Sequence, residues 1–102
     1  MAIIDSYRNI LTVLAHFEMG AERADELMKL VQEFIPRIKE CPGFISANFH
    51  LATDHSEIFN YAQWQTESAY LDFREGELFK EIEKAIKPFN PKIQTFKVVL
   101  AT

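Results

Sequence analysis

The spacing of apolar side chains changes in a definite order along the chain, and this order restricts the fold more than any other feature. Two segments, 22–40 and 66–86, repeat apolar residues three and four apart, which places them in one stripe along a helix. Four others alternate apolar and polar residues, the period of a β-strand, and these are 9–19, 43–53, 58–65 and 94–101. The order strand, helix, strand, strand, helix, strand predicts a ferredoxin-like α+β fold, in which an antiparallel sheet carries both helices on one face.

Residues that break or start regular structure fall where this order needs them. Residues 41–43 and 54–56 are expected to form turns. Thr66 is expected to cap the second helix and Gly76 to interrupt it. Pro36 is expected to bend or loosen the first helix, because proline has no N–H to donate and crowds the preceding turn.

Length and composition indicate one globular domain that spans residues 1–102. The chain has 102 residues, of which 48% are hydrophobic and 25% charged, a balance typical of a packed soluble domain. No apolar run approaches the roughly 18 residues of a membrane helix, and the first residues do not resemble a secretory signal. We therefore expect a cytoplasmic protein that does not bind membranes.

The charge balance and the cysteine content exclude further classes. Lys and Arg number 11 against 15 Asp and Glu, a net charge of −4, which argues against binding to nucleic-acid phosphates. Cys41 is the single cysteine, so an intrachain disulfide or a cysteine-based zinc cluster within one chain is excluded. We expect Cys41 to be a small packing residue at a helix end.

Assigning alternate strand residues to opposite faces predicts two faces of different chemistry. One set is largely apolar and contains Leu11, Val13, Ala15, Phe17, Ile45, Ala47, Phe49, Leu51, Phe59, Tyr61, Gln63, Phe96, Val98 and Leu100. The other set is mixed and contains Ile10, Thr12, Leu14, His16, Phe44, Ser46, Asn48, His50, Ile58, Asn60, Ala62, Trp64, Thr95, Lys97, Val99 and Ala101.

Two arrangements of these faces are open. In a monomer, the apolar set packs under the helices and the mixed set meets water. In a homodimer, a second chain covers the apolar set, and the mixed set becomes the wall of a pocket under the helices. Trp64 favours the second arrangement, because a tryptophan is poorly placed in the middle of a solvated face.

Two short stretches resemble the antibiotic-biosynthesis monooxygenase family. They are 42–44, a proline, glycine and phenylalanine before the second strand, and 60–64, a strand that runs from an asparagine to a tryptophan and leads into a helix. Length and element order also agree. The resemblance implies a homodimeric α+β barrel, in which two sheets pack through their apolar faces and each subunit keeps one cavity between its sheet and helices.

The resemblance also implies site residues and a reaction. An asparagine, a tryptophan and a tyrosine line the substrate cavity of the polyketide-modifying branch, and Asn60, Trp64 and Tyr70 match them. Such proteins oxidise a phenol or quinol with molecular oxygen and need neither metal nor flavin. Asn60 and Trp64 lie four apart on one strand and therefore project to the same face, where they can hydrogen-bond to substrate oxygens.

Charged and titratable residues supply the remaining candidates. The branch uses a basic residue on the second helix to stabilise an anion, and Arg74 or Lys84 is expected there, with a solvated surface cation as the alternative for each. His50 is a candidate base, while His16 and Asn48, on the same mixed set, are expected to contact substrate.

Metal and haem sites are not expected. His16, His50 and His55 do not have the spacing of a metal site, and no carboxylate is expected beside His16 or His50. The haem-degrading branch of the superfamily uses a histidine on the second helix, and this chain has no histidine after His55.

Two functions of different classes follow. The first is a cofactor-independent monooxygenase that acts on a small aromatic phenol or quinol with molecular oxygen. The second is a non-catalytic dimeric module, either ligand-binding or stress-related, because a fold is compatible with many functions. An RNA-binding sheet is a distant third, since Phe49 and Tyr61 lack accompanying lysines and arginines.

Overall fold

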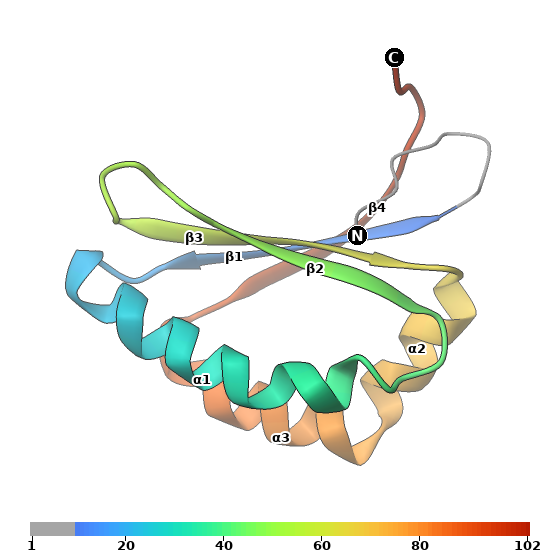
Figure 1. Cartoon of the computed structure of the whole chain (residues 1–102), viewed down its shortest axis with the longest axis horizontal. Coiled ribbons are helices and arrows are strands. Elements are labelled where there is room, and N and C mark those ends of the chain that lie inside the picture. The colour runs from blue at the N-terminus through green and yellow to red at the C-terminus, as the bar shows by residue number, and fades with distance from the viewer. Residues whose placement is uncertain (1–9) are drawn as a thin grey trace.

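The computed structural model describes residues 10–102, in which one sheet has its helices packed on a single face (Figure 1). The strands are β1 (Leu11–Glu18), β2 (Phe44–Leu51), β3 (Glu57–Trp64) and β4 (Lys92–Lys97), in the spatial order β2-β3-β1-β4. Every neighbouring pair is antiparallel. The ferredoxin-like prediction is therefore confirmed, although Asn9, predicted to begin the first strand, lies outside the described residues.

The first helical layer is α1 (Ala24–Ile38), preceded by a 3₁₀ turn, η1 (Ala21–Arg23). Its buried residues are Ala24, Leu27 and Val31, the stripe that faces the sheet. The helix continues without interruption through Pro36 and ends two residues later. Both Pro36 and Gln32 are exposed, so water can bind the Gln32 carbonyl that loses its helical partner.

The second helical segment is divided as predicted, into α2 (Glu67–Glu75) and α3 (Glu77–Ile86). Thr66 caps α2, because its Oγ1 accepts a hydrogen bond from the Ala69 N–H at 3.0 Å. Gly76 has an extended backbone (ψ 166°) and separates the two helices. A second 3₁₀ turn, η2 (Lys87–Phe89), then leads to β4. Within residues 10–102, no helix is long and apolar enough to span a bilayer.

Gly43 fixes the corner where α1, β2 and α2 meet. Its φ is +83°, and a Cβ at this position would lie 2.4 Å from the Cβ of Ala69. The Gly43 carbonyl also accepts a hydrogen bond from the Gln65 N–H at 2.7 Å. This close contact ties the start of β2 to the start of α2, and it places Phe44 opposite Trp64.

The strand register corrects the predicted faces. Val13 and Ala15 lie opposite Ala62 and Asn60, and Phe49 also lies opposite Asn60. Opposed residues share a face, so odd residues of β1 and β2 join the even residues of β3. The prediction wrongly combined odd residues of all three strands. It also placed Phe96 with the odd residues of the first strand, whereas Phe96 lies opposite Thr12.

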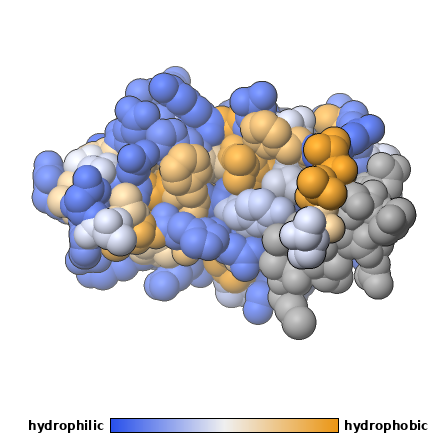
Figure 2. All heavy atoms as spheres, turned by 90° about the horizontal axis from the view of Figure 1, so that it is seen from above, coloured by the Kyte–Doolittle hydropathy of each residue, from blue (hydrophilic) through white to orange (hydrophobic). Residues whose placement is uncertain are grey.

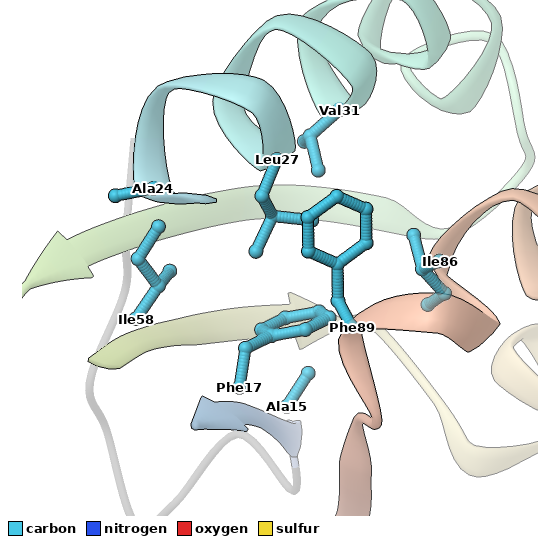
Figure 3. Close-up of a cluster of buried hydrophobic side chains, with 8 residues drawn as sticks. All are labelled: Ala15, Phe17, Ala24, Leu27, Val31, Ile58, Ile86 and Phe89. Atoms are coloured by element: carbon cyan, nitrogen blue, oxygen red, sulfur yellow. The ribbon is translucent and has the colours of Figure 1, made fainter. Parts of the chain in front are cut away.

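The face under the helices contains the core. One cluster packs residues of β1, β3, α1, α3 and η2 together (Figure 3). A second cluster combines Leu11, Val13, Ala62, Trp64 and Tyr70, with Phe44 and Phe73 packed against it. Phe49, which the dimer arrangement places on an exposed interface, instead packs against the first cluster.

The opposite side of the sheet, which we call the open face, carries Thr12, Leu14, His16, Ser46, Asn48, His50, Phe59, Tyr61, Gln63, Gln94 and Phe96. Apolar groups are visible among polar ones when the molecule is seen from this side (Figure 2). Phe59 and Phe96 are each 41% exposed.

Candidate active site

A cavity of about 100 Å³ lies between the sheet and the helices and is partly open to solvent. It borders both core clusters, and every strand and every α-helix contributes lining residues. Nearly all of these are aliphatic or phenylalanine. The polar side chains among the described lining residues belong to Asn60, Trp64 and Tyr70, the three that the sequence singled out.

Trp64 ends β3 and is held by aromatic rings on several sides. Its side chain is buried, with the residue only 2% exposed. The Phe44 ring meets it edge-on at a centroid distance of 5.5 Å, and the Phe73 ring lies at 4.8 Å. This packing fixes the indole and its N–H at the cavity wall.

Tyr70 reaches the cavity from the capped first turn of α2. The residue is 4% exposed, and its ring centroid lies 5.8 Å from that of Trp64. Its hydroxyl oxygen accepts a hydrogen bond from Arg74 Nη1 at 2.9 Å. The tyrosine oxygen is therefore anchored at one of its two acceptor sites, while its own O–H remains a donor.

Asn60 contributes a half-buried amide from the middle of β3. Its Oδ1 accepts a hydrogen bond from the Asn48 backbone N–H at 3.2 Å. This contact fixes which end of the amide is the oxygen, so the NH₂ group is left as a donor. Within residues 10–102, neither this NH₂ group nor the Trp64 N–H has a hydrogen-bond partner.

The three polar groups therefore share one property: each still has an N–H or O–H to donate. The described lining contains no histidine and no carboxylate. Fixed donors that line an apolar site stabilise oxygen atoms that carry or develop negative charge. The cavity is thus suited to an oxygen-bearing apolar molecule, and more to its anion than to its neutral form.

The two candidate cations lie in different surroundings. The Arg74 guanidinium stacks over the Phe79 ring, 4.4 Å from its centroid, in addition to its bond to Tyr70. Lys84 is exposed and lies in a surface groove with Glu83 and Lys87. Arg74 thus contacts a cavity residue, whereas the expectation that Lys84 reaches the cavity is wrong.

The histidines and Asn48 are not where they were expected. His50 lies opposite Phe59 and Asn48 opposite Tyr61, so both project from the open face, away from the cavity. His16 also lies opposite Phe59 and stacks on that ring at 4.2 Å. The expectation that these side chains share a pocket with Trp64 is therefore wrong, because the register joins strands of opposite parity. His55 lies in the exposed turn, as predicted.

His16 has carboxylate neighbours that the sequence reasoning missed. Its Nε2 lies 2.5 Å from Glu57 Oε1, and its Nδ1 lies 3.7 Å from Glu18 Oε1. These ligand-type atoms lie within 4.8 Å of one another, on the open face. Glu18 and Glu57 are direct cross-strand partners, so the register of β1 against β3, two strands far apart in the chain, was the signal needed to find the group.

Cys41 follows α1 and does not line the cavity. Burial raises the pKa of its thiol, and the adjacent Glu40 carboxylate raises it further. The sulfur is 3.7 Å from the Arg37 carbonyl. Because the thiolate is the reactive form, these surroundings fit a packing residue better than a nucleophile.

Comparisons with known proteins agree with the fold. The sequence profile of the antibiotic biosynthesis monooxygenase family matches residues 10–85. Tetracenomycin-F1 monooxygenase of Streptomyces glaucescens is 40% identical over 75 residues, which make up 72% of this chain and 64% of that protein. The match therefore spans less than two thirds of that relative's length.

Solved structures extend the comparison to the whole domain. A monooxygenase of Streptomyces coelicolor, in complex with nanaomycin D, is 28% identical with a TM-score of 0.80, covering 96% of this chain and 94% of that one. A conserved protein of Methanosarcina mazei Go1 is 17% identical with a TM-score of 0.79, covering 90% of this chain and 95% of the other. At that identity the second likeness concerns the fold alone.

Proposed function

Because this chain belongs to the antibiotic biosynthesis monooxygenase family, we propose that it is a monooxygenase that oxidises a small aromatic phenol or quinol with molecular oxygen, without metal or flavin. The observation that carries the proposal is the cavity itself, an apolar space whose polar side chains all retain a hydrogen to donate. The named activities of the two Streptomyces relatives support the reaction class.

In the proposed reaction, the substrate loses a proton and its anion reduces oxygen. For an anthrone, the ring CH₂ becomes C=O, one oxygen atom enters the product and the other leaves as water, so one O₂ is consumed for each substrate. Asn60, Trp64 and Tyr70 bind the substrate oxygens and stabilise the anion, while the apolar walls exclude water. Because the described lining lacks a histidine and a carboxylate, we assign the initial proton to water at the open side of the cavity.

The volume of the cavity limits how the substrate binds. About 100 Å³ accommodates no more than a single aromatic ring without side-chain movement. A substrate with several rings must therefore extend through the open side, with its reactive ring held near Trp64 and Tyr70. Substrates whose second ring can reach solvent are expected to be the better ones.

We also propose a homodimer formed through the open face. The half-exposed rings of Phe59 and Phe96 lie on this face, and Val99 and Leu100 after β4 are 90% and 78% exposed. Apolar groups gathered in this way favour association with a second copy. Sedimentation equilibrium tests the proposal: we expect a dimer at micromolar concentration and at least a tenfold weaker dimer for Phe59→Ser. A monomer at all concentrations would contradict it.

Oxygen uptake tests the enzymatic proposal. Purified protein, treated with a chelator, is incubated with a panel of hydroquinones and anthrones, and oxygen consumption is compared with a control without protein. Trp64→Phe keeps an aromatic ring and removes the indole N–H, and we expect at least a tenfold lower rate. Leu71→Ala, an exposed residue of α2 that does not line the cavity, is the matched control and should leave the rate unchanged. Uptake equal to the protein-free control across the panel would instead favour a ligand-binding module.

A further inference from the structure

The side chain of Arg74 has surroundings that differ from those of the other described arginines. Arg23 pairs with Glu26, although its guanidinium also lies over the Phe89 ring, and the exposed Arg37 pairs with Glu81. Arg74 has no carboxylate partner within residues 10–102, although α2 and α3 carry several glutamates. Its charge is directed instead toward the Tyr70 oxygen and the faces of the Tyr70 and Phe79 rings.

The position of Arg74 is fixed from two sides. It lies four residues after Tyr70, so the two side chains project from the same face of α2. Phe79 comes from α3, beyond the break at Gly76, and its ring stacks under the guanidinium at 4.4 Å. Phe79 in turn packs edge-on against Phe73, which contacts Trp64. The guanidinium therefore lies directly behind residues that line the cavity and does not line the cavity itself.

The direction of the hydrogen bond between the two residues follows from their chemistry. A guanidinium carries only donors, so the Tyr70 oxygen must be the acceptor at 2.9 Å. The phenolic hydrogen cannot then be directed at Arg74. Within residues 10–102, the phenolic hydrogen has no acceptor. Tyr70 lines the cavity and is only 4% exposed. The cavity is the direction in which this hydrogen can find a partner.

We propose that Arg74 is a positioning residue that acts through Tyr70, occupying one acceptor site of the phenolic oxygen so that its O–H donates to an oxygen atom of the bound molecule. This inference rests on the proposed function for the role of that oxygen, but it concerns binding and does not require turnover. A donor bonded to a cation is also the stronger donor, because the charge polarises the O–H bond. Arg74 thus transmits its charge to the cavity without entering it.

Binding of two matched probes tests the inference without any reaction. 1-Tetralone offers one carbonyl acceptor, whereas tetralin has the same rings and none. The chain has a single tryptophan, so the indole N–H resonance of ¹⁵N-labelled protein reports binding at the cavity wall. We expect wild-type protein to bind 1-tetralone more tightly than tetralin, and Arg74→Met to weaken 1-tetralone binding about tenfold while tetralin binding stays unchanged.

Three further variants separate positioning from a structural role. Arg74→Lys retains a donor without an acceptor and should recover most of the lost affinity. Tyr70→Phe should lower 1-tetralone affinity by a similar factor, and adding Arg74→Met to Tyr70→Phe should then change it less than twofold, because the effect passes through the hydroxyl. Independent losses that multiply in the double variant, or equal losses for both probes, would overturn the inference, as would a wild-type protein that does not distinguish the probes. If the binding results hold while no oxygen is consumed, the inference stands and the proposed reaction fails.

Discussion

Adjacent residues of β3 belong to two different environments. On one side, Asn60 and Trp64 line a cavity where their N–H groups have no described protein partner. On the open face, polar groups bind each other: Asn48 Nδ2 donates to Ser46 Oγ at 3.1 Å and to the Tyr61 carbonyl at 2.9 Å. Unpaired donors beside an apolar space fit the proposed small-molecule site, whereas paired polar groups between exposed rings fit the proposed dimer interface.

The largest change in the free energy of unfolding is expected for Ile58, in comparison with its neighbour Phe59. Ile58 is 1% exposed beneath the helices, so Ile58→Ala leaves a cavity in the core and should lower the free energy of unfolding by about 3 kcal/mol. Phe59→Ala removes a larger side chain from the open face, but it should lower the free energy of unfolding by less than half as much as Ile58→Ala does. Urea unfolding at concentrations that keep the chain monomeric measures both. Equal losses would contradict the division between the faces.

A smaller loss of stability is expected at the corner where α1, β2 and α2 meet. Gly43→Ala forces a Cβ onto Ala69 at a backbone conformation that favours glycine, and we expect the free energy of unfolding to fall by about 2 kcal/mol. Ala69→Gly in the same chain should restore part of the loss, because it removes the contact and leaves the strained φ. Gly20→Ala is the matched control, since its new Cβ would meet only the flexible Glu22 carboxylate at 3.3 Å. A larger loss at Gly20 than at Gly43 would refute this account of the corner.

The open face offers a change that should increase stability. Thr12 is buried there, and its Oγ1 has no hydrogen-bond partner within residues 10–102. Thr12→Val replaces the hydroxyl with a methyl group of similar size and should raise the free energy of unfolding by about 1 kcal/mol. Thr95→Val, at an exposed position of β4, should change it by less than about 0.5 kcal/mol. Destabilisation by Thr12→Val would indicate that the hydroxyl is satisfied.

The smallest effect concerns the outer surface of the helices, remote from both faces. Arg37 donates a hydrogen bond to Glu81, and this contact lowers the pKa of the Glu81 carboxyl. A lowered pKa in the folded state stabilises the protein above the ordinary glutamate pKa of about 4.3, and the contribution is lost as the pH falls from there through the lowered folded-state pKa. Wild type should therefore be slightly more stable than Glu81→Gln at pH 7 and not at pH 3. Both side chains are exposed, so high salt should remove the difference as well.

The sequence predicted the features that depend on local spacing. The element order, the Thr66 cap and the break at Gly76 are all set by residues close together in the chain, and the structure confirms them. Asn60, Trp64 and Tyr70 were singled out by the family resemblance, and all three line the cavity, while their role there stays a prediction. The i,i+4 relation of Tyr70 and Arg74 could be read in the same way, whereas the Phe79 contact could not, since it crosses a bend of unknown angle.

The sharing of faces between strands could not be predicted in this way. Leu51 pairs with Ile58 across the hairpin, so an odd-numbered residue lies opposite an even-numbered one. Which residues of the two strands pair depends on the number of residues in the turn. A bulge between Phe44 and Ser46 changes the parity again within β2. His16, Asn48 and His50 were assigned to the cavity because one parity was assumed for the first three strands.

The break at Gly76 makes the wall of the cavity adjustable. Tyr70 and Arg74 belong to α2, before the break, and Phe79 belongs to α3, after it. The guanidinium of Arg74 and the ring of Phe79 therefore meet across the break. One residue inserted at Gly76 would turn α3 by about 100° about its axis and bring a different side chain beneath the guanidinium of Arg74. Gly76 is therefore a place where the wall of the cavity can change while the sequence of every strand stays the same.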